Sequence, residues 1–332
     1  MDKFIDLHLH LDGAITPAIA RELAALQDMP LPEKDADLEK LLTVQPDCKD
    51  LNEFLACFQL PIALLQTPEA LTAAVRLVSE NIRSQGVIYA ELRFAPQSHT
   101  AKKMTQEDAV KAALKGLSET ALKANLILCC MRGSDNYAAN LETLELCRKY
   151  LVPDGGVVAL DLAGAEALFP TADYRSLFQK AAAYGIPFTI HAGEADGPYS
   201  VRNAIEFGAR RIGHGVRSAD DPEVIRLIRE KGIPLEMCPT SNRQTRAIED
   251  LSKYPLIPFL DQGIKVTINT DDMGIEGTTL AKEFEYLEEA FHLTAEQKKR
   301  ILMNAAEAAF TTDEVKTWLK SSVDSGFRTA NL

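Results

Sequence analysis

An α/β fold with the architecture of a (β/α)8 barrel is predicted for this sequence of 332 residues. The first observation is that short runs rich in β-branched residues alternate with amphipathic segments along the whole chain. The second is that eight such runs are present, which favours closure of a parallel sheet into a barrel. The third concerns the alternative, an open doubly wound sheet, which needs a glycine-rich phosphate turn after its first strand. The sequence there is Asp12-Gly13-Ala14, which is no such turn.

The expected strands are bounded by turn residues and separated by segments long enough for a crossover helix. They cover residues 4–11, 87–94, 125–132, 157–163, 187–192, 211–215, 234–239 and 265–270. Barrels of this type routinely exceed 200 residues as one unit. We therefore expect a single domain over residues 1–332.

Helix boundaries are marked between the expected strands. Thr67 offers an N-cap before a first-turn proline, apolar residues recur at helical spacing after it, and a glycine closes the segment. Residues 200–208 and 221–232 repeat this plan on shorter helices. Thr294 with Gln297 predicts a capping box for a late helix.

One interval is too long for a single crossover, and we assign a helical insertion to residues 13–86. Apolar residues recur there at helical spacing, at Leu51, Phe54, Leu55 and Phe58. Two interpretations stay open at this point. The insertion supplies extra core helices, or it forms an apolar lid over the barrel mouth, where long insertions commonly shape active sites.

Composition excludes several classes of partner. The chain has 36 basic and 48 acidic residues, which gives a net charge of −12, and no basic patch is visible. A polyanion would be repelled, so we expect neither nucleic acid nor an acidic membrane as a partner, but a small molecule. The six cysteines form no CxxC pair, no apolar run approaches the ~20 residues of a membrane helix, and no signal peptide is visible. We expect a cytoplasmic protein, and the sequence is compatible with a homo-oligomer.

Ionisable residues gather at the carboxyl ends of the expected strands. His8 and His10 alternate in the first strand, so both face the same side, which in a barrel is the interior. His191 ends the fifth strand, His214 lies in the sixth, and the eighth runs into Asp271-Asp272. A lone buried imidazole is costly, so this gathering of histidines calls for a ligand.

Neutral imidazoles with one carboxylate are the ligand set of a catalytic zinc ion at the barrel mouth. The pair on the first strand can share a metal that a third histidine and an aspartate complete. A second metal would need a bridging group such as a modified lysine near the fourth strand, and residues 157–164 contain none. We therefore expect one ion, which would lower the pKa of a bound water towards ~7.

The remaining acids and bases then have roles in this chemistry. Glu194 can donate a proton to a substrate atom if an apolar site keeps it protonated. His214 can orient the nucleophile or move its proton. Asp272 can hold a water or a ring nitrogen by hydrogen bonding. Singly, each of these residues has an ordinary structural explanation, as a loop acid, a core histidine or a turn residue.

The motifs together resemble the adenosine deaminase family of the amidohydrolase superfamily, in the right order from His8 to Asp272. They are His8-Leu9-His10-Leu11-Asp12-Gly13, Asp161-Leu162-Ala163-Gly164, His191-Ala192-Gly193-Glu194, Arg211-Ile212-Gly213-His214-Gly215, Cys238-Pro239-Thr240-Ser241-Asn242 and Asn269-Thr270-Asp271-Asp272. The family is a (β/α)8 barrel with one zinc ion, so the resemblance implies a hydrolase of purine salvage that converts adenosine and 2′-deoxyadenosine to inosine, 2′-deoxyinosine and ammonia.

The resemblance also implies roles for individual residues. The metal ligands would be His8, His10, His191 and Asp271; the catalytic residues would be Glu194, His214 and Asp272; the substrate-binding residues would be His10, Asp12, Gly164 and Asp272, with Leu51, Phe54 and Leu55 as an apolar gate. Glu194 would protonate a ring nitrogen of the purine, and the amide of Gly164 would meet the purine edge.

Substrate choice depends on Asp12. In adenosine deaminases an aspartate at this position binds sugar hydroxyls, and relatives that act on adenine or on N6-methyl-AMP tend to carry glutamate or asparagine there. An aspartate would also repel a nucleotide phosphate beside it. Ala165 departs from the family, where many members have aspartate. The alternatives are a deaminase of another aminopurine and a non-catalytic protein that binds purine nucleosides.

Overall fold

The computed structural model describes residues 3–45, 48, 54 and 56–329. Within them all eight expected strands are present, as β1 Phe4–His10, β2 Val87–Phe94, β3 Lys123–Met131, β4 Val157–Ala163, β5 His191–Ala192, β6 Ile212–His214, β7 Leu235–Met237 and β8 Val266–Ile268. Strands β5 to β8 are shorter than the sequence indicates. All neighbouring strands pair in parallel, in the orders β1-β2-β3-β4 and β5-β6-β7-β8.

Backbone hydrogen bonds join these two sheets at both seams. Between β4 and the segment before β5, the amide of Leu160 donates to Pro187 O at 3.0 Å and the amide of Thr189 donates to Leu160 O at 3.1 Å. Between the end of β8 and β1, the amide of Asp271 donates to His8 O at 2.8 Å and the amide of His10 donates to Asp271 O at 2.9 Å. The predicted (β/α)8 barrel is confirmed.

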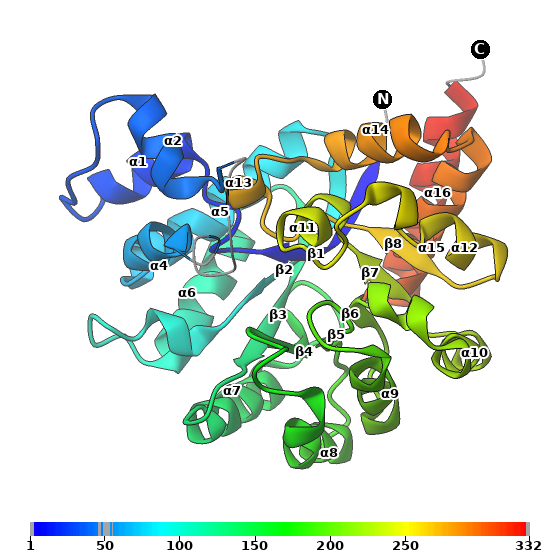
Figure 1. The fold of residues 1–332 in the computed structure, drawn as a ribbon. Coiled ribbons are helices and arrows are strands. Elements are labelled where there is room, and N and C mark those ends of the chain that lie inside the picture. Colours follow the sequence, from blue (N-terminus) through cyan, green and yellow to red (C-terminus); the bar gives the residue numbers. More distant parts are fainter. Residues whose placement is uncertain (1–2, 46–47, 49–53, 55, 330–332) are drawn as a thin grey trace.

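Helices surround the strands, as Figure 1 shows. They are α5 Pro68–Ser84, α6 Gln106–Ser118, α7 Tyr137–Tyr150, α8 Arg175–Ala183, α9 Pro198–Phe207, α10 Pro222–Lys231, α11 Pro239–Gln244, α12 Leu256–Asp261, α13 Met273–Glu276, α14 Leu280–Phe291, α15 Ala295–Ala308 and α16 Asp313–Thr329. The Thr67 cap and the Thr294–Gln297 capping box are confirmed. Helix α9 begins at Pro198 rather than at residue 200, because that proline takes the first helical position.

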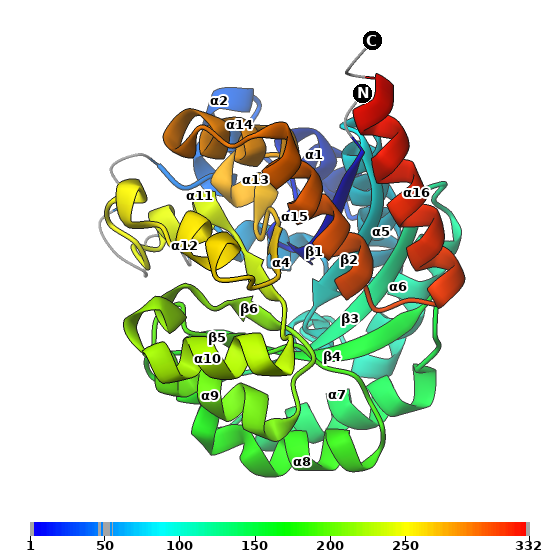
Figure 2. The ribbon, with the colours of Figure 1, turned by 90° about the vertical axis from the view of Figure 1, so that its right-hand side faces the viewer.

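The insertion after β1 contains α1 Pro17–Ala25, α2 Asp35–Leu42 and α4 Gln59–Leu64, before the crossover helix α5. These three short helices lie to one side of the strands in Figure 1, and in the turned view of Figure 2 α4 lies behind the strands. Ile19 and Leu23 of α1 are buried in the main core, whereas Phe54 and Phe58 line a cavity at the barrel mouth. The insertion thus contributes to the core and to the cavity wall. Leu51 and Leu55, two residues of the predicted gate, lie outside the described residues.

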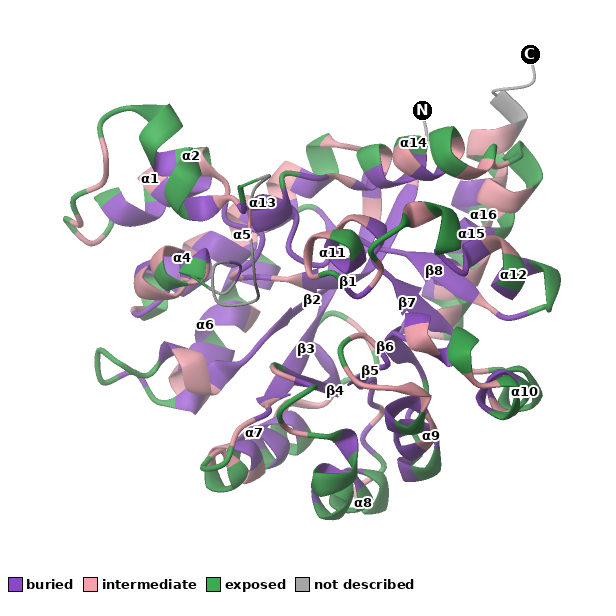
Figure 3. Cartoon of the chain, viewed as in Figure 1, coloured by how far each residue is buried: buried purple, intermediate pink, exposed green. Residues whose placement is uncertain are grey.

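Burial separates the strands from the outer faces of the helices, as Figure 3 shows. The barrel interior is not uniformly apolar, because Glu91, Arg93, Asp161, Arg211 and Glu236 are all essentially buried within it. These charges lie beneath the histidines of the mouth and bear on their chemistry. In the part of the chain that the structure describes, no helix is long and apolar enough to span a membrane.

Candidate active site

Four side chains from three strand ends converge at the barrel mouth. The Nε2 atom of His191 lies 3.0 Å from Nε2 of His8 and 3.1 Å from Nε2 of His10. Oδ1 of Asp271 lies 3.2 Å from Nε2 of His8 and 3.4 Å from Nε2 of His10. One donor atom from each of the four residues falls within 4.8 Å of the others. The structure therefore brings together all four of the predicted metal ligands.

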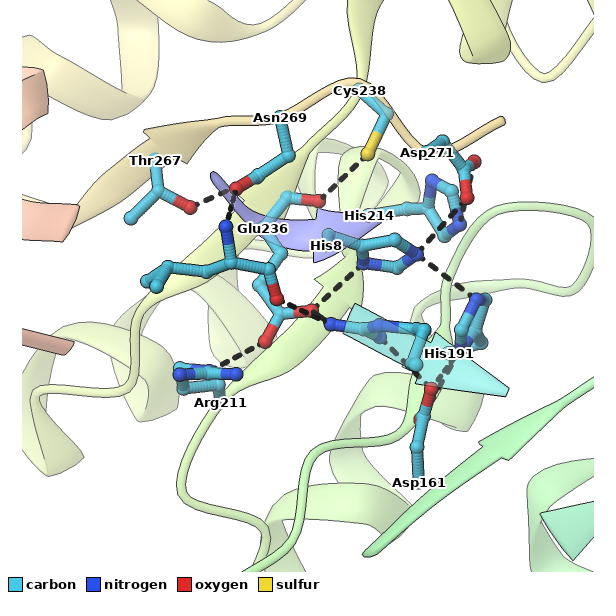
Figure 4. A network of polar contacts seen from close by, with 12 residues as sticks. His8, Asp161, His191, Arg211, His214, Glu236, Cys238, Thr267, Asn269 and Asp271 are labelled. Atoms are coloured by element: carbon cyan, nitrogen blue, oxygen red, sulfur yellow. Dashed lines mark hydrogen bonds and ion pairs between the residues drawn. The ribbon is translucent and has the colours of Figure 1, made fainter. Parts of the chain in front are cut away.

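Carboxylates behind the histidines orient the rings for metal binding, as Figure 4 shows. Nδ1 of His8 contacts Oε2 of Glu236 at 2.8 Å, and Nδ1 of His191 contacts Oδ2 of Asp161 at 3.0 Å. Each carboxylate fixes a ring proton on Nδ1, which leaves Nε2 as the nitrogen that can bind a metal ion. These two nitrogens, together with Nε2 of His10 and one carboxylate oxygen of Asp271, fit a single divalent ion.

Two buried arginines keep these carboxylates ionised. Arg93 donates to Asp161 and to Glu236, at 2.9 Å in each case, and Nε of Arg211 contacts Glu236 at 2.5 Å. Burial alone would raise the pKa of Glu236, but the two guanidinium groups outweigh it and hold that pKa well below its usual range. The charge behind the ligands is therefore permanent near neutral pH.

The predicted metal ligands have strongly perturbed pKa values. Burial lowers the pKa of His10 well below its usual value, so this imidazole is neutral. Burial also opposes the charged form of His8, but Asp271 and Glu236 outweigh it and raise its pKa to about 9. The neighbouring histidines hold the pKa of Asp271 well below the ordinary range despite its burial. A metal ion would therefore displace a proton from His8 on binding.

His214 projects into the same centre with a defined tautomer. Its Nε2 lies 3.5 Å from Oε2 of Glu194 and 3.7 Å from Oδ2 of Asp271, and these two acceptor oxygens favour a proton on that nitrogen. Its Nδ1 accepts from the side-chain amide of Asn242 at 3.0 Å, and the hydroxyl of Tyr254 contacts Oδ1 of Asn242 at 3.1 Å. Burial lowers the pKa of His214, which keeps the ring neutral. His214 therefore presents an N–H to the cavity.

Glu194 is held at both ends. Its carboxyl oxygen Oε1 accepts from the hydroxyl of Thr245 at 2.9 Å, and its backbone carbonyl accepts from Nε of Arg217 at 2.7 Å. The carboxyl thus stays at the cavity wall rather than turning towards solvent.

Asp272, Asp12 and Gly164 line the same cavity, which has a volume of about 550 Å³. Burial first, and then the nearby acids Asp271 and Asp12, raise the pKa of Asp272 well above its usual value. Oδ1 of Asp272 is buried and has no hydrogen-bond partner among the residues that the structure describes. Gly164 has a φ of 103°, a left-handed conformation that suits glycine. Burial raises the pKa of Asp12 to about 6.

Comparison with known proteins gives one consistent result. The family model described as adenosine deaminase matches residues 4–326. The chain belongs to the adenosine deaminase family. A Haemophilus ducreyi protein named adenosine deaminase is 49% identical over 326 residues, which cover 96% of this chain and 95% of that protein. The expectation of an enzyme of this family is therefore confirmed.

Solved structures of related deaminases have the same fold as this chain. An adenine deaminase from Arthrobacter aurescens has a TM-score of 0.88 at 27% identity, covering 99% of this chain and 100% of that chain. The apo N6-methyl-AMP deaminase from Arabidopsis thaliana has a TM-score of 0.83 at 25% identity, covering 98% and 96%. The similar proteins are named adenosine deaminase, adenine deaminase and N6-methyl-AMP deaminase. The substrate must therefore be inferred from the residues that line the cavity.

Sequence reasoning assigned no role to several residues of this adenosine deaminase family site. Asp161 and Glu236 are carboxylates inside strands, and their position was a usable signal, because an acid on the inner face of a barrel needs a partner. Asn242, Tyr254 and Thr245 carried no such signal, because only the fold brings them to His214 and Glu194.

Proposed function

We propose that this chain is a zinc-dependent enzyme that hydrolyses adenosine and 2′-deoxyadenosine. In the overall reaction, adenosine and water give inosine and ammonia. The observation that supports this most is the convergence of three imidazole nitrogens and one carboxylate oxygen within 4.8 Å, beside Glu194 and Asp272 in one cavity. Nitrogen-rich ligands with one carboxylate suit zinc, and the outer carboxylates supply the orientation that such sites need.

The zinc ion, held by His8, His10, His191 and Asp271, would supply Lewis-acid activation of water. The chain's own residues do the rest. His214 donates its Nε2–H to the attacking water and fixes the direction of attack. Glu194 gives a proton to the ring nitrogen beside the carbon that bears the amino group, and this relieves the charge that the attack places on the ring.

Asp272 and Gly164 orient the purine. Because the pKa of Asp272 is strongly raised, its carboxyl is protonated and can donate to a second ring nitrogen. The unpartnered Oδ1 of Asp272 is the kind of buried polar atom that a ligand satisfies. The backbone amide of Gly164 meets the opposite edge of the purine. Two directional contacts of this kind hold the ring so that one carbon faces the nucleophile.

Apolar side chains from the insertion cover the cavity, and we propose that they act as its lid. Phe54, Phe58 and Ile62 line it opposite the strand ends, and Phe54 is buried. Closing such a site excludes bulk water, which strengthens every hydrogen bond to the purine. Leu51 and Leu55 belong to the same proposed gate and lie outside the described residues.

Asp12 favours a nucleoside over a nucleotide. Its carboxylate lines the cavity, where it can accept hydrogen bonds from two sugar hydroxyls, whereas a phosphate beside it would be repelled. Adenine and N6-methyl-AMP are the competing substrates, because two structural relatives carry those names. We also propose a cytoplasmic location and a small-molecule partner, which suit a chain with a net charge of −12.

A turnover panel tests this proposal. Purified enzyme of known zinc content is given adenosine, 2′-deoxyadenosine, adenine, AMP and N6-methyl-AMP, and ammonia release is measured with each. We expect the highest kcat/KM with the two nucleosides and one zinc ion per chain. Preference for AMP or adenine would overturn the argument from Asp12. Full activity in zinc-free protein would overturn the metal site.

A further inference from the structure

The segment from His191 to Asp196 carries two groups on which the proposed function depends, a metal ligand and the proton donor Glu194. Its first two residues form β5, and residues 193–196 lead towards α9 without regular secondary structure. Its backbone polar groups therefore need partners from elsewhere. Two buried charged side chains from neighbouring loops, Arg132 and Glu166, supply them.

Glu166 accepts hydrogen bonds from four consecutive backbone amides of this segment. Its Oε1 accepts from the amide of Gly193 at 2.7 Å. Its Oε2 accepts from the amides of Glu194 at 3.0 Å, Ala195 at 2.8 Å and Asp196 at 3.1 Å. Gly193 has a φ of 71°, and this left-handed turn points the successive N–H groups to one side. Such a concave run of amides is an anion-binding nest, which here holds the chain's own carboxylate.

Arg132 holds the carbonyl side of the same segment. It donates to His191 O at 2.6 Å, and further hydrogen bonds to Thr171 Oγ1 at 3.0 Å and Phe169 O at 2.6 Å fix the guanidinium itself. The Arg132 guanidinium therefore binds a carbonyl of this segment, and the Glu166 carboxylate binds its amides. Burial would raise the pKa of Glu166, but the hydroxyl of Ser200, the charge of Arg132 and the backbone amides outweigh it and keep the carboxyl ionised.

We propose that Glu166 is a positioning residue for catalysis, because its carboxylate fixes the backbone from which Glu194 reaches the substrate. The proposal rests on the proposed function, in which Glu194 must lie within hydrogen-bond distance of a ring nitrogen. Glu166 also lies two residues after Gly164, so the loop that meets the purine edge is tied to the loop that delivers the proton. The same side chain therefore links the backbone that carries Glu194 to the loop that carries Gly164.

Glu166→Gln is the main test, since the substitution keeps the shape of the side chain. Glutamine has one acceptor oxygen, and its amide nitrogen would face backbone N–H groups that need an acceptor. Hydrogen–deuterium exchange of the amides of 193–196 should accelerate on the order of tenfold or more, the equivalent of one charge-assisted hydrogen bond. The kcat should fall on the order of 100-fold, as expected for a displaced catalytic group. KM and zinc content should stay close to wild type.

Two further variants separate positioning from stability. Glu166→Asp keeps both oxygens on a shorter stem, so its exchange rates and kcat should lie between those of wild type and Glu166→Gln. Asp154→Asn is the matched control. It makes the same carboxylate-to-amide change before β4, where Asp154 contacts the Thr311 hydroxyl at 2.7 Å, far along that strand from Glu166. It should lower the melting temperature without changing the exchange of 193–196.

Three outcomes would overturn the proposal. The first is normal exchange and normal kcat in Glu166→Gln. The second is accelerated exchange with an unchanged kcat, since the order of the backbone would then not matter to the reaction. The third is a loss of kcat that zinc loss accounts for in full. A wild-type protein that deaminates none of the aminopurines would refute the proposed function instead, and the exchange data would still decide whether Glu166 orders the segment.

Discussion

Asp161→Asn is the substitution that most directly tests the metal centre. The carboxylate of Asp161 contacts Nδ1 of His191 at 3.0 Å through Oδ2, and the same oxygen accepts from Arg93 at 2.9 Å. Its Oδ1 accepts from the amide of Leu162 at 2.7 Å. Both oxygens of this carboxylate therefore face N–H donors. In either orientation of its side-chain amide, asparagine would point its NH2 group at one of these donors, and that hydrogen bond would be lost.

The expected loss in metal affinity follows from these contacts. A hydrogen bond to an ionised acceptor is roughly twice as strong as a neutral one, so the change at His191 costs about 1.5 kcal/mol, or about tenfold in zinc affinity. Loss of ring orientation adds to this, and outer-shell substitutions of this kind typically cost about 10- to 100-fold. In the metal-free protein the substitution breaks the buried Arg93–Asp161 pair and should lower the free energy of unfolding by about 3 kcal/mol. We expect this lower end of the usual range because Arg93 keeps its hydrogen bond to Glu236.

The assay is a competitive titration of apo protein with zinc against a chromophoric chelator, run beside urea unfolding. Asp154→Asn serves again as the matched control and should bind zinc as wild type does. A zinc dissociation constant for Asp161→Asn indistinguishable from that of wild type would refute the reasoning, because His191 would then not depend on Asp161 for its orientation.

Three other substitutions give equally direct results. Glu194→Gln cannot supply a proton, so kcat should fall by about 10²- to 10⁴-fold with zinc retained, and near-normal turnover would remove Glu194 from its role. Asp12→Asn should raise KM for adenosine by about tenfold, the cost of about one hydrogen bond to a charged group, and leave adenine unaffected; an equal change with both would place Asp12 away from the sugar. Burial raises the pKa of Glu283 from 4.5 to about 7, so the folded state binds the extra proton and wild type loses stability as pH rises from about 4.5 to about 7. Glu283→Gln, which lacks this titration, should be more stable than wild type at pH 8 by about 3 kcal/mol in urea unfolding, and the advantage should vanish near pH 4.5.

The strands and the convergence of the four proposed ligands were predictable because they obey local rules. Alternation in β1 places His8 and His10 on one face, and parallel strands present their carboxyl ends at one mouth. The extent of β5 was not predictable. Its expected first residue, Pro187, has no N–H to donate and offers only its carbonyl to β4. Regular pairing with β6 begins only at His191.

Contacts between distant segments were beyond a single sequence. Asn242 lies 28 positions from His214, and its role follows only from the way α11 packs over the mouth. Glu166 carried a misleading signal, since an acid in an irregular loop is usually solvated, whereas this one is 3% exposed and surrounded by amides. No local sequence pattern marks such a residue, because its partners are backbone amides, which are present in every sequence.

The backbone that closes the barrel also carries three of the four proposed metal ligands. His8, His10 and Asp271 exchange the two main-chain hydrogen bonds that join β8 to β1, so the spacing of three ligands is set by sheet geometry and not by side-chain packing. The fourth ligand, His191, belongs to the other sheet. A bound ion would therefore link both sheets and stabilise the closed barrel in proportion to its affinity. It follows that loss of metal and opening of the β8–β1 seam are coupled, and that amides at this seam should exchange faster in the apo protein than in the zinc form.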